Sequence, residues 1–275
     1  MPIVMEEAKC LYMSVSTYAS ISQSAALDFL QKTFDFLQPY TTDPELRFYP
    51  IWHPVGSRSR SRSLRRLKWE EVAQDFPLEG FDLVIWKEKL RSSLGRNPHV
   101  GGVCISFSQE PEKASLLEFA LNVKEMLNGR VSEAVQAWVV ELALSTFRAV
   151  EGVVGYITVD YVITSGYTMS PYEQAVGLSY PWAARGLRSK VRGYYWGNLL
   201  SRGHVELLGG EEVLSAAPVY LVKKLENGYY LQLTEDINNI DRGKLAQLKE
   251  FLKPLLPEGY PQSPEYYQNL PDFVL

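Results

Sequence analysis

Cysteine and histidine, two residue types that often build metal and redox sites, are scarce in this sequence and widely spaced. Cys10 and Cys104 form no Cys-x-x-Cys pair, so the sequence indicates neither a redox pair nor a zinc site. We expect two small, buried thiols in a reducing compartment. The three histidines, His53, His99 and His204, show no His-Glu-x-x-His spacing, and structural or surface roles are expected for them.

Catalytic motifs are also lacking. The sequence contains no Gly-x-Ser-x-Gly elbow, no P-loop and no Gly-x-Gly-x-x-Gly that follows a strand, and these are parts that acyl transfer, phosphate binding and dinucleotide binding require. Cys104 as a nucleophile is disfavoured by its apolar surroundings. The oxygen-rich cluster at 234–241, which includes Asp236, is favoured as a turn and helix cap over a cation site. No enzyme, cofactor or metal is predicted.

Neither a strong charge of one sign nor a long apolar run is present. The formal net charge is −4 and the pI about 5.6, a mildly acidic balance that suits a basic protein partner better than nucleic acid or an anionic membrane. No segment reaches the roughly 18 apolar residues of a membrane span. The acidic N-terminus lacks an export signal, and Pro2 occupies the position where myristoylation needs glycine. A cytoplasmic protein is expected.

One basic segment stands out against this balance. Residues 57–68 read Ser-Arg-Ser-Arg-Ser-Arg-Ser-Leu-Arg-Arg-Leu-Lys, and their polarity and mutual repulsion predict a mobile loop. Such a run binds nucleic-acid backbones when stacking aromatics or a known module support it. Neither is visible, so nucleic-acid binding, or a scaffold role that uses this loop, is kept as the alternative function.

Strand and helix patterns are mixed without regular β-α-β alternation, which favours an α+β fold with a mostly antiparallel sheet and packed helices. We expect one domain over 1–256, with 1–110 and 111–256 as alternative halves of similar α/β type, and a proline-rich tail over 257–275. Strands are expected at 11–19, 46–52, 81–86, 103–108 and 153–163. Residues 115–126 fit both the alternation of a strand and a helical stripe, and a strand is favoured there. Helices are expected from Ser22 or Ser24 to 37, at 69–76, from Ser132 to about 152, at 172–177 and at 242–252. Asn227-Gly228 predicts a type I′ hairpin between 220–225 and 229–233.

The densest run of unusual residues is 192–210, Arg-Gly-Tyr-Tyr-Trp-Gly-Asn-Leu-Leu-Ser-Arg-Gly-His-Val-Glu-Leu-Leu-Gly-Gly. By physical chemistry alone it predicts a strand end and a short amphipathic helix at 199–208. Asn198 is expected to cap this helix, and Gly209-Gly210 to end it in a left-handed conformation. Gly193 introduces the aromatic triplet, and Trp196 is expected as a core anchor.

The order of these motifs resembles the C-terminal half of a bacterial type VI immunity family. The resemblance rests on Gly193-x-x-Trp196-x-x-x-Leu200, on Leu207-Leu208-Gly209-Gly210, and on the strand that leads into the Asp236-containing turn. The upstream pieces occur in the family's order, so the similarity spans about 11–256. The Arg-Ser run and the tail depart from it.

The resemblance implies a non-enzymatic inhibitor that binds a polymorphic or type VI secreted antibacterial toxin and occludes its active site. It implies a toxin that acts in the cytoplasm, a nuclease with a restriction-endonuclease-like fold, toward which acidic side chains would steer association. An unrecognised hydrolase is the remaining alternative. Interface residues leave no motif, so the candidates are the exposed members of one set: Tyr194, Tyr195, Arg202, His204, Glu211 and Glu212.

Overall fold

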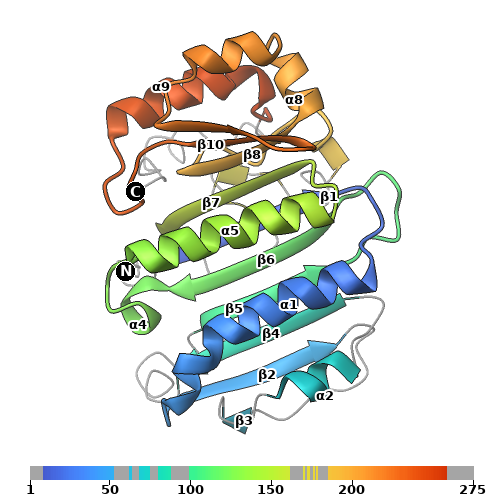
Figure 1. Cartoon of the computed structure of the whole chain (residues 1–275), viewed down its shortest axis with the longest axis vertical. Coiled ribbons are helices and arrows are strands. Elements are labelled where there is room, and N and C mark those ends of the chain that lie inside the picture. The colour runs from blue at the N-terminus through green and yellow to red at the C-terminus, as the bar shows by residue number, and fades with distance from the viewer. Residues whose placement is uncertain are drawn as a thin grey trace.

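A single antiparallel sheet of ten strands organises the computed structural model, which describes residues 9–52, 62–63, 68–74, 80–87, 99–161, 170, 172–173, 176, 178 and 185–258. The strand order is β3-β2-β4-β5-β6-β1-β7-β8-β10-β9 (Figure 1). The strands are β1 (Lys9–Thr17), β2 (Leu46–Trp52), β3 (Arg62–Ser63), β4 (Gly80–Lys87), β5 (His99–Ser106), β6 (Ser115–Asn122), β7 (Val154–Tyr161), β8 (Gly197–Ser201), β9 (Leu221–Lys224) and β10 (Gly228–Gln232). The α+β class predicted from the sequence is confirmed.

The helices lie on the sheet and at one end of it. They are α1 (Gln23–Leu37), α2 (Trp69–Gln74), α4 (Val123–Met126), α5 (Glu133–Ala149), α8 (Arg202–Leu207) and α9 (Arg242–Leu252), with 3-10 turns η1 (Gln38–Thr42), η4 (Glu211–Ala216) and η5 (Lys253–Leu255). Ser22 and Ser132 cap α1 and α5 by accepting hydrogen bonds from Ala25 and Val135, as expected for serine at an N-cap. In the ranges that the structure describes, no helix is long and apolar enough to cross a membrane.

One face of the sheet is apolar and is covered by α1 and α5, which run across it side by side (Figure 1). Alternate residues of β1 and β6 supply this face, among them Met13 and Phe119, which are paired in the register. The Phe119 ring lies 5.8 Å from Phe36 of α1 and 4.9 Å from Trp138 of α5, measured between ring centroids. The main core therefore lies between the sheet and these two helices.

The opposite face of the same central strands carries polar side chains, because alternation along a strand sends neighbouring residues to opposite faces. Ser14 of β1 is paired with Glu118 of β6 and with Tyr156 of β7, and all three are buried. Segment 185–196 covers this face, since Arg192 hydrogen-bonds to Ser14 and the Tyr195 ring lies 4.6 Å from that of Tyr156.

β1 occupies the middle of the sheet, between β6 and β7. A strand of the first sequence half therefore pairs on both edges with strands of the second. The sheet is continuous across the two halves, and the prediction of one domain over 1–256 stays a prediction. Beyond Glu258, the proline-rich tail lies outside the described residues.

Most predicted elements are present, and β2, α9 and the serine-capped start of α5 match their predicted bounds. The strand expected over 115–126 is correct for β6, but its last four residues form α4 because the Asn122 side chain caps them, accepting from Glu125 at 2.9 Å. The strand expected at 103–108 begins earlier, at His99. Gly101 lies inside this strand, where a Cβ would approach Leu121 to 2.8 Å. The helix expected at 172–177 is described only in part.

The type I′ prediction for the Asn227-Gly228 hairpin is wrong, because neither residue has positive φ. The two strands form as expected, with Gly228 inside β10, where a Cβ would overlap the Leu200 carbonyl. The Asn227 side chain donates to the carbonyl of Phe147 at the end of α5, at 3.0 Å. Asn227 and Gly228 therefore make contacts with residues distant in sequence, and neither adopts the left-handed conformation that a type I′ turn requires.

The Arg-Ser run is described at three of its positions, Arg62, Ser63 and Lys68. Arg62 and Ser63 form β3, which pairs with Phe48 and Arg47 of β2, so this part of the predicted loop is an edge strand. The other positions between 57 and 67 lie outside the described residues, and so does His53.

Candidate interaction surface

A buried ion cluster holds segment 185–196 against the polar face of the sheet. The Arg192 guanidinium donates to Glu173 through Nε at 3.0 Å and Nη2 at 2.9 Å. Its Nη1 reaches Ser14 Oγ at 2.9 Å and Glu118 Oε1 at 3.2 Å. All four side chains are buried. A cation so enclosed is stable only when it is paired and hydrogen-bonded, and Arg192 therefore joins β1, β6 and the segment around Glu173.

Glu118 is the weakly satisfied member of this cluster. Its Oε1 accepts from Ser14 at 3.0 Å, whereas its Oε2 has no hydrogen-bond partner among the described residues. Burial raises the pKa of Glu118 to about 7, against the lowering effect of Arg192. The four side chains are buried against one another, and Glu173 also lines a pocket of about 260 Å³ beside segment 185–191; we assign the cluster a structural role.

Both cysteines are buried and free, as predicted. Burial raises the pKa of Cys10 to about 12. Burial also raises the pKa of Cys104 well above its ordinary value, with the carboxylates of Asp82 and Glu118 adding to the effect. Both shifts favour the protonated thiol, which agrees with the expectation that Cys104 is not a nucleophile.

The aromatic triplet of the 192–210 stretch is buried. Tyr194, Tyr195 and Trp196 are 7%, 0% and 1% exposed, and Trp196 Nε1 donates to the carbonyl of Thr234 at 2.9 Å. Gly193 has a φ of +145°, and a side chain there would overlap the Tyr195 ring. The three aromatic side chains therefore pack in the core and hold segment 185–196 against it.

The helix expected at 199–208 is two elements. Residues 197–201 form β8, and α8 begins at Arg202. The expectation that Asn198 caps this helix is wrong. Asn198 is paired with Leu231 in the sheet, and its side chain instead closes the preceding turn by bonding to both the N–H and the carbonyl of Tyr195, at 3.0 and 2.7 Å. Gly209 and Gly210 follow α8 with φ of +112° and +100°.

The six partner-binding candidates divide by burial. Tyr194, Tyr195 and His204 are buried, and His204 bonds through Nδ1 to Ser201 Oγ at 2.8 Å and through Nε2 to the Lys190 carbonyl at 3.3 Å. Burial lowers the pKa of His204. These three side chains pack in the core of this structure. The exposed candidates are Arg202, Glu211 and Glu212.

Asp236 organises a contact between two distant segments. Its carboxylate accepts from Gln136 at 2.8 Å and from Arg130 at 3.1 Å, and backbone and side chain of Asn238 also donate to it. These bonds lower the pKa of Asp236 against the opposing effect of desolvation. The turn before α9 is thereby fixed to the start of α5, and Asp241 caps α9 by accepting from Lys244 at 3.0 Å.

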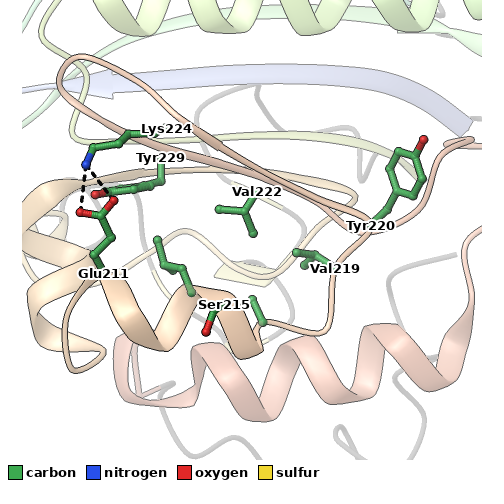
Figure 2. A pocket seen from close by; sticks show the side chains of 9 residues that line it. Glu211, Ser215, Val219, Tyr220, Val222, Lys224 and Tyr229 are labelled. Atoms are coloured by element: carbon green, nitrogen blue, oxygen red, sulfur yellow. Dashed lines mark hydrogen bonds and ion pairs between the residues drawn. The ribbon is translucent and has the colours of Figure 1, made fainter.

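An open groove of about 390 Å³ lies between η4 and the β9–β10 hairpin (Figure 2). Its walls combine apolar and polar side chains from the two sides: Leu214, Ala217, Val219, Val222 and the ring of Tyr229 with Glu211, Ser215, Tyr220 and Lys224. At one end Lys224 Nζ bridges both oxygens of Glu211, at 2.7 and 2.9 Å (Figure 2). The hydrogen bond from Lys224 lowers the pKa of Glu211 and the same pair raises the pKa of Lys224.

Exposed apolar side chains gather beside this groove. Tyr220, Leu221 and Val222 are 54%, 41% and 37% exposed, and Leu207 is the remaining large apolar residue exposed in the described ranges. Three in a row is unusual for a protein surface, where apolar residues are normally scattered singly. We call Tyr220, Leu221 and Val222 the β9 strip. It is the candidate interaction surface.

Sequence reasoning missed both the β9 strip and the Arg192 cluster. The strip was visible only as the first half of a hairpin, although lysines at its end, Lys223 and Lys224, are typical of an edge strand. The partners of Arg192 lie 19, 74 and 178 residues away in the chain, so no local pattern could reveal them.

Comparison with known proteins shows a similarity of fold to a solved structure. No family model matches the sequence, and no curated protein matches it. Among solved structures, the fold is similar to that of the Pseudomonas aeruginosa T6SS protein PA0821, with a TM-score of 0.62 and 15% sequence identity. The match covers 90% of this chain and 76% of that chain, so the two share most of their architecture.

Proposed function

We propose that this protein is an immunity protein of a type VI secretion system, which binds a secreted antibacterial toxin and occludes its active site with one-to-one stoichiometry. The observation that carries the proposal is the fold. The chain is similar in structure to a protein named as a T6SS protein, and its C-terminal motifs independently resemble a type VI immunity family.

The surface supports a protein as the ligand. The β9 strip offers adjacent apolar side chains with a groove beside them, and an apolar centre with a polar rim is the usual anatomy of a protein interface. Exposed Arg202, Glu211 and Glu212 lie on α8 and η4, next to this region in sequence. A nuclease with a restriction-endonuclease-like fold that acts in the cytoplasm is the toxin class that the family resemblance favours.

Co-expression tests the proposal. The C-terminal domain of each candidate toxin from the adjacent genes is induced with and without this protein, and we expect growth to be restored for one of them. The purified toxin domain should form a one-to-one complex by light scattering, and its nuclease activity should fall linearly to zero at one equivalent. Failure to rescue any adjacent candidate, together with failure to capture any of them, contradicts the function.

A further inference from the structure

β9 is the outermost strand at one end of the sheet, and β10 is its neighbour on the inner side. Residues of an antiparallel strand point their peptide groups alternately toward and away from the neighbouring strand. The N–H of Leu225 bonds to the Gly228 carbonyl at 2.8 Å. Counting back from this bond, the peptide groups of Lys223 and Leu221 face β10. Those of Val222 and Lys224 face outward.

Of the two lysines on β9, Lys223 stays exposed beside Leu221, and Lys224 is drawn away from the edge. Lysines and prolines commonly deter strand pairing, but Lys224 folds back on Glu211 and lies 5.9 Å from the centroid of the Tyr229 ring. Across the β9 strip no charged side chain intervenes. Tyr220 and Val222 line the groove together with Lys224, whereas Leu221 and Lys223 alternate to the other face. A strand laid along β9 therefore finds apolar side chains on both faces.

The surrounding charge indicates which partner fits. Residues 197–258, which form this end of the sheet and the helices beside it, hold nine acidic and seven basic side chains, a net charge of −2. Glu212 and Glu226, which flank β9 in sequence, are exposed, and no ion pair of theirs is found among the described residues. A basic partner is therefore attracted to this end of the sheet, and a second acidic copy of the same chain is not.

We propose that the outer edge of β9 accepts an extended segment of the toxin as an eleventh strand. This inference rests on the proposed function. The added strand takes its hydrogen bonds from the peptide groups of Val222 and Lys224, places apolar side chains over the groove, and carries basic residues at its flanks toward Glu212 and Glu226. Main-chain pairing of this kind supplies affinity, and pockets for alternate side chains supply specificity.

A proline at Val222 tests the pairing. Val222→Pro removes an N–H that faces away from β10 and puts a ring at the edge, so it should leave the fold intact and weaken the toxin complex about tenfold or more. Val222→Thr is the matched control, since it keeps the N–H and the branched shape and should bind within a few-fold of the parent. The probe is the purified toxin domain that the parent protein neutralises, and affinity is measured by calorimetry.

Amide hydrogen exchange of the parent protein gives a second readout that does not depend on a variant folding. On adding the toxin domain, the amides of Val222 and Lys224 should become protected. Those of Leu221 and Lys223, already bonded to β10, should change less. Neutralising the flanks with Glu212→Gln and Glu226→Gln should slow association several-fold at low salt and have little effect at high salt.

The outcomes separate the two proposals. If the parent protein rescues growth but Val222→Pro binds as tightly as Val222→Thr, or the outward amides stay unprotected in the complex, β9 is not the docking edge while the immunity function stands. If the amides of Val222 and Lys224 are already protected from exchange in the free protein, and more so at higher protein concentration, a second copy of the chain is bound to β9. If that protection is lost when residues 259–275 are deleted, the chain's own tail is bound there. Either result overturns the inference.

Discussion

At the residue scale, the buried cluster around Arg192 joins one cation to two carboxylates that are not equivalent. Glu173 accepts from two nitrogens of the guanidinium, whereas Glu118 shares Nη1 with Ser14, and its Oε2 has no partner in the part of the chain that the structure describes. Desolvation consequently outweighs attraction at Glu118, whose pKa rises to about 7. Folding therefore favours the protonated form of this carboxyl group.

This shift predicts the pH dependence of stability. A carboxyl group whose pKa is raised from 4.5 to about 7 on folding carries no penalty below pH 4.5; the penalty grows between pH 4.5 and about 7 and stays constant above that. Relative to Glu118→Gln, which is neutral at every pH, the parent protein should lose unfolding free energy over this window and then level off by pH 8. Urea denaturation of both proteins across this range measures the difference. Glu112→Gln, at an exposed site, is the control, and parallel curves for Glu118→Gln and the parent would contradict the assignment.

At the element scale, the β9–β10 hairpin is held by its fit to β8 and α5, and not by its turn. Gly228 sits where any Cβ would overlap the carbonyl of Leu200, and its partner in the register is Ser201. Gly228→Ala must therefore push β10 away from β8 at this end, and we expect a cost of about 2 kcal/mol or more. Thermal melting should show a Tm lowered by several degrees.

Gly203→Ala is the matched control for this substitution. Gly203 lies in α8, where the nearest atom to an added Cβ is Ser201 Oγ at 3.8 Å. Alanine is favoured over glycine in a helix, so this variant should melt at the parent temperature or slightly above it. Equal Tm values for the two alanine variants would show that the contact with Leu200 does not constrain the hairpin.

Sequence patterns predicted elements well where the determinants are local. The N-cap serines fixed α1 and α5, and apolar periodicity and the Asp241 cap fixed α9. Sequence patterns gave wrong predictions where a contact with a distant residue determines the local structure. The amphipathic pattern of residues 199–208 predicts Asn198 as a helix cap, but Asn198 pairs with Leu231 and is part of a strand. The β9 strip is not predictable in this way, because exposure depends on where the sheet ends.

At the scale of the whole molecule, stability should be graded from the middle of the sheet to its ends. β1 is bonded on both edges, and its Leu11, Met13 and Val15 are fully buried, whereas β9 is bonded on one edge and all four of its residues are exposed. In the free protein the amide of Met13 should exchange only through global unfolding, and that of Val222 at close to the rate of an open chain. Exchange monitored by NMR tests this order, and equal rates at the two sites would contradict it.

The central place of β1 has a consequence for synthesis on the ribosome. The strand leaves the ribosome early, but its two neighbours end at Asn122 and Tyr161, so at roughly 5–20 residues per second β1 waits on the order of ten seconds for both. During that interval its apolar alternate residues have no sheet to join. A nascent chain of this protein is therefore a natural client for chaperones that hold unpaired strands, and cutting the coding sequence between the halves should yield two fragments that fold only together.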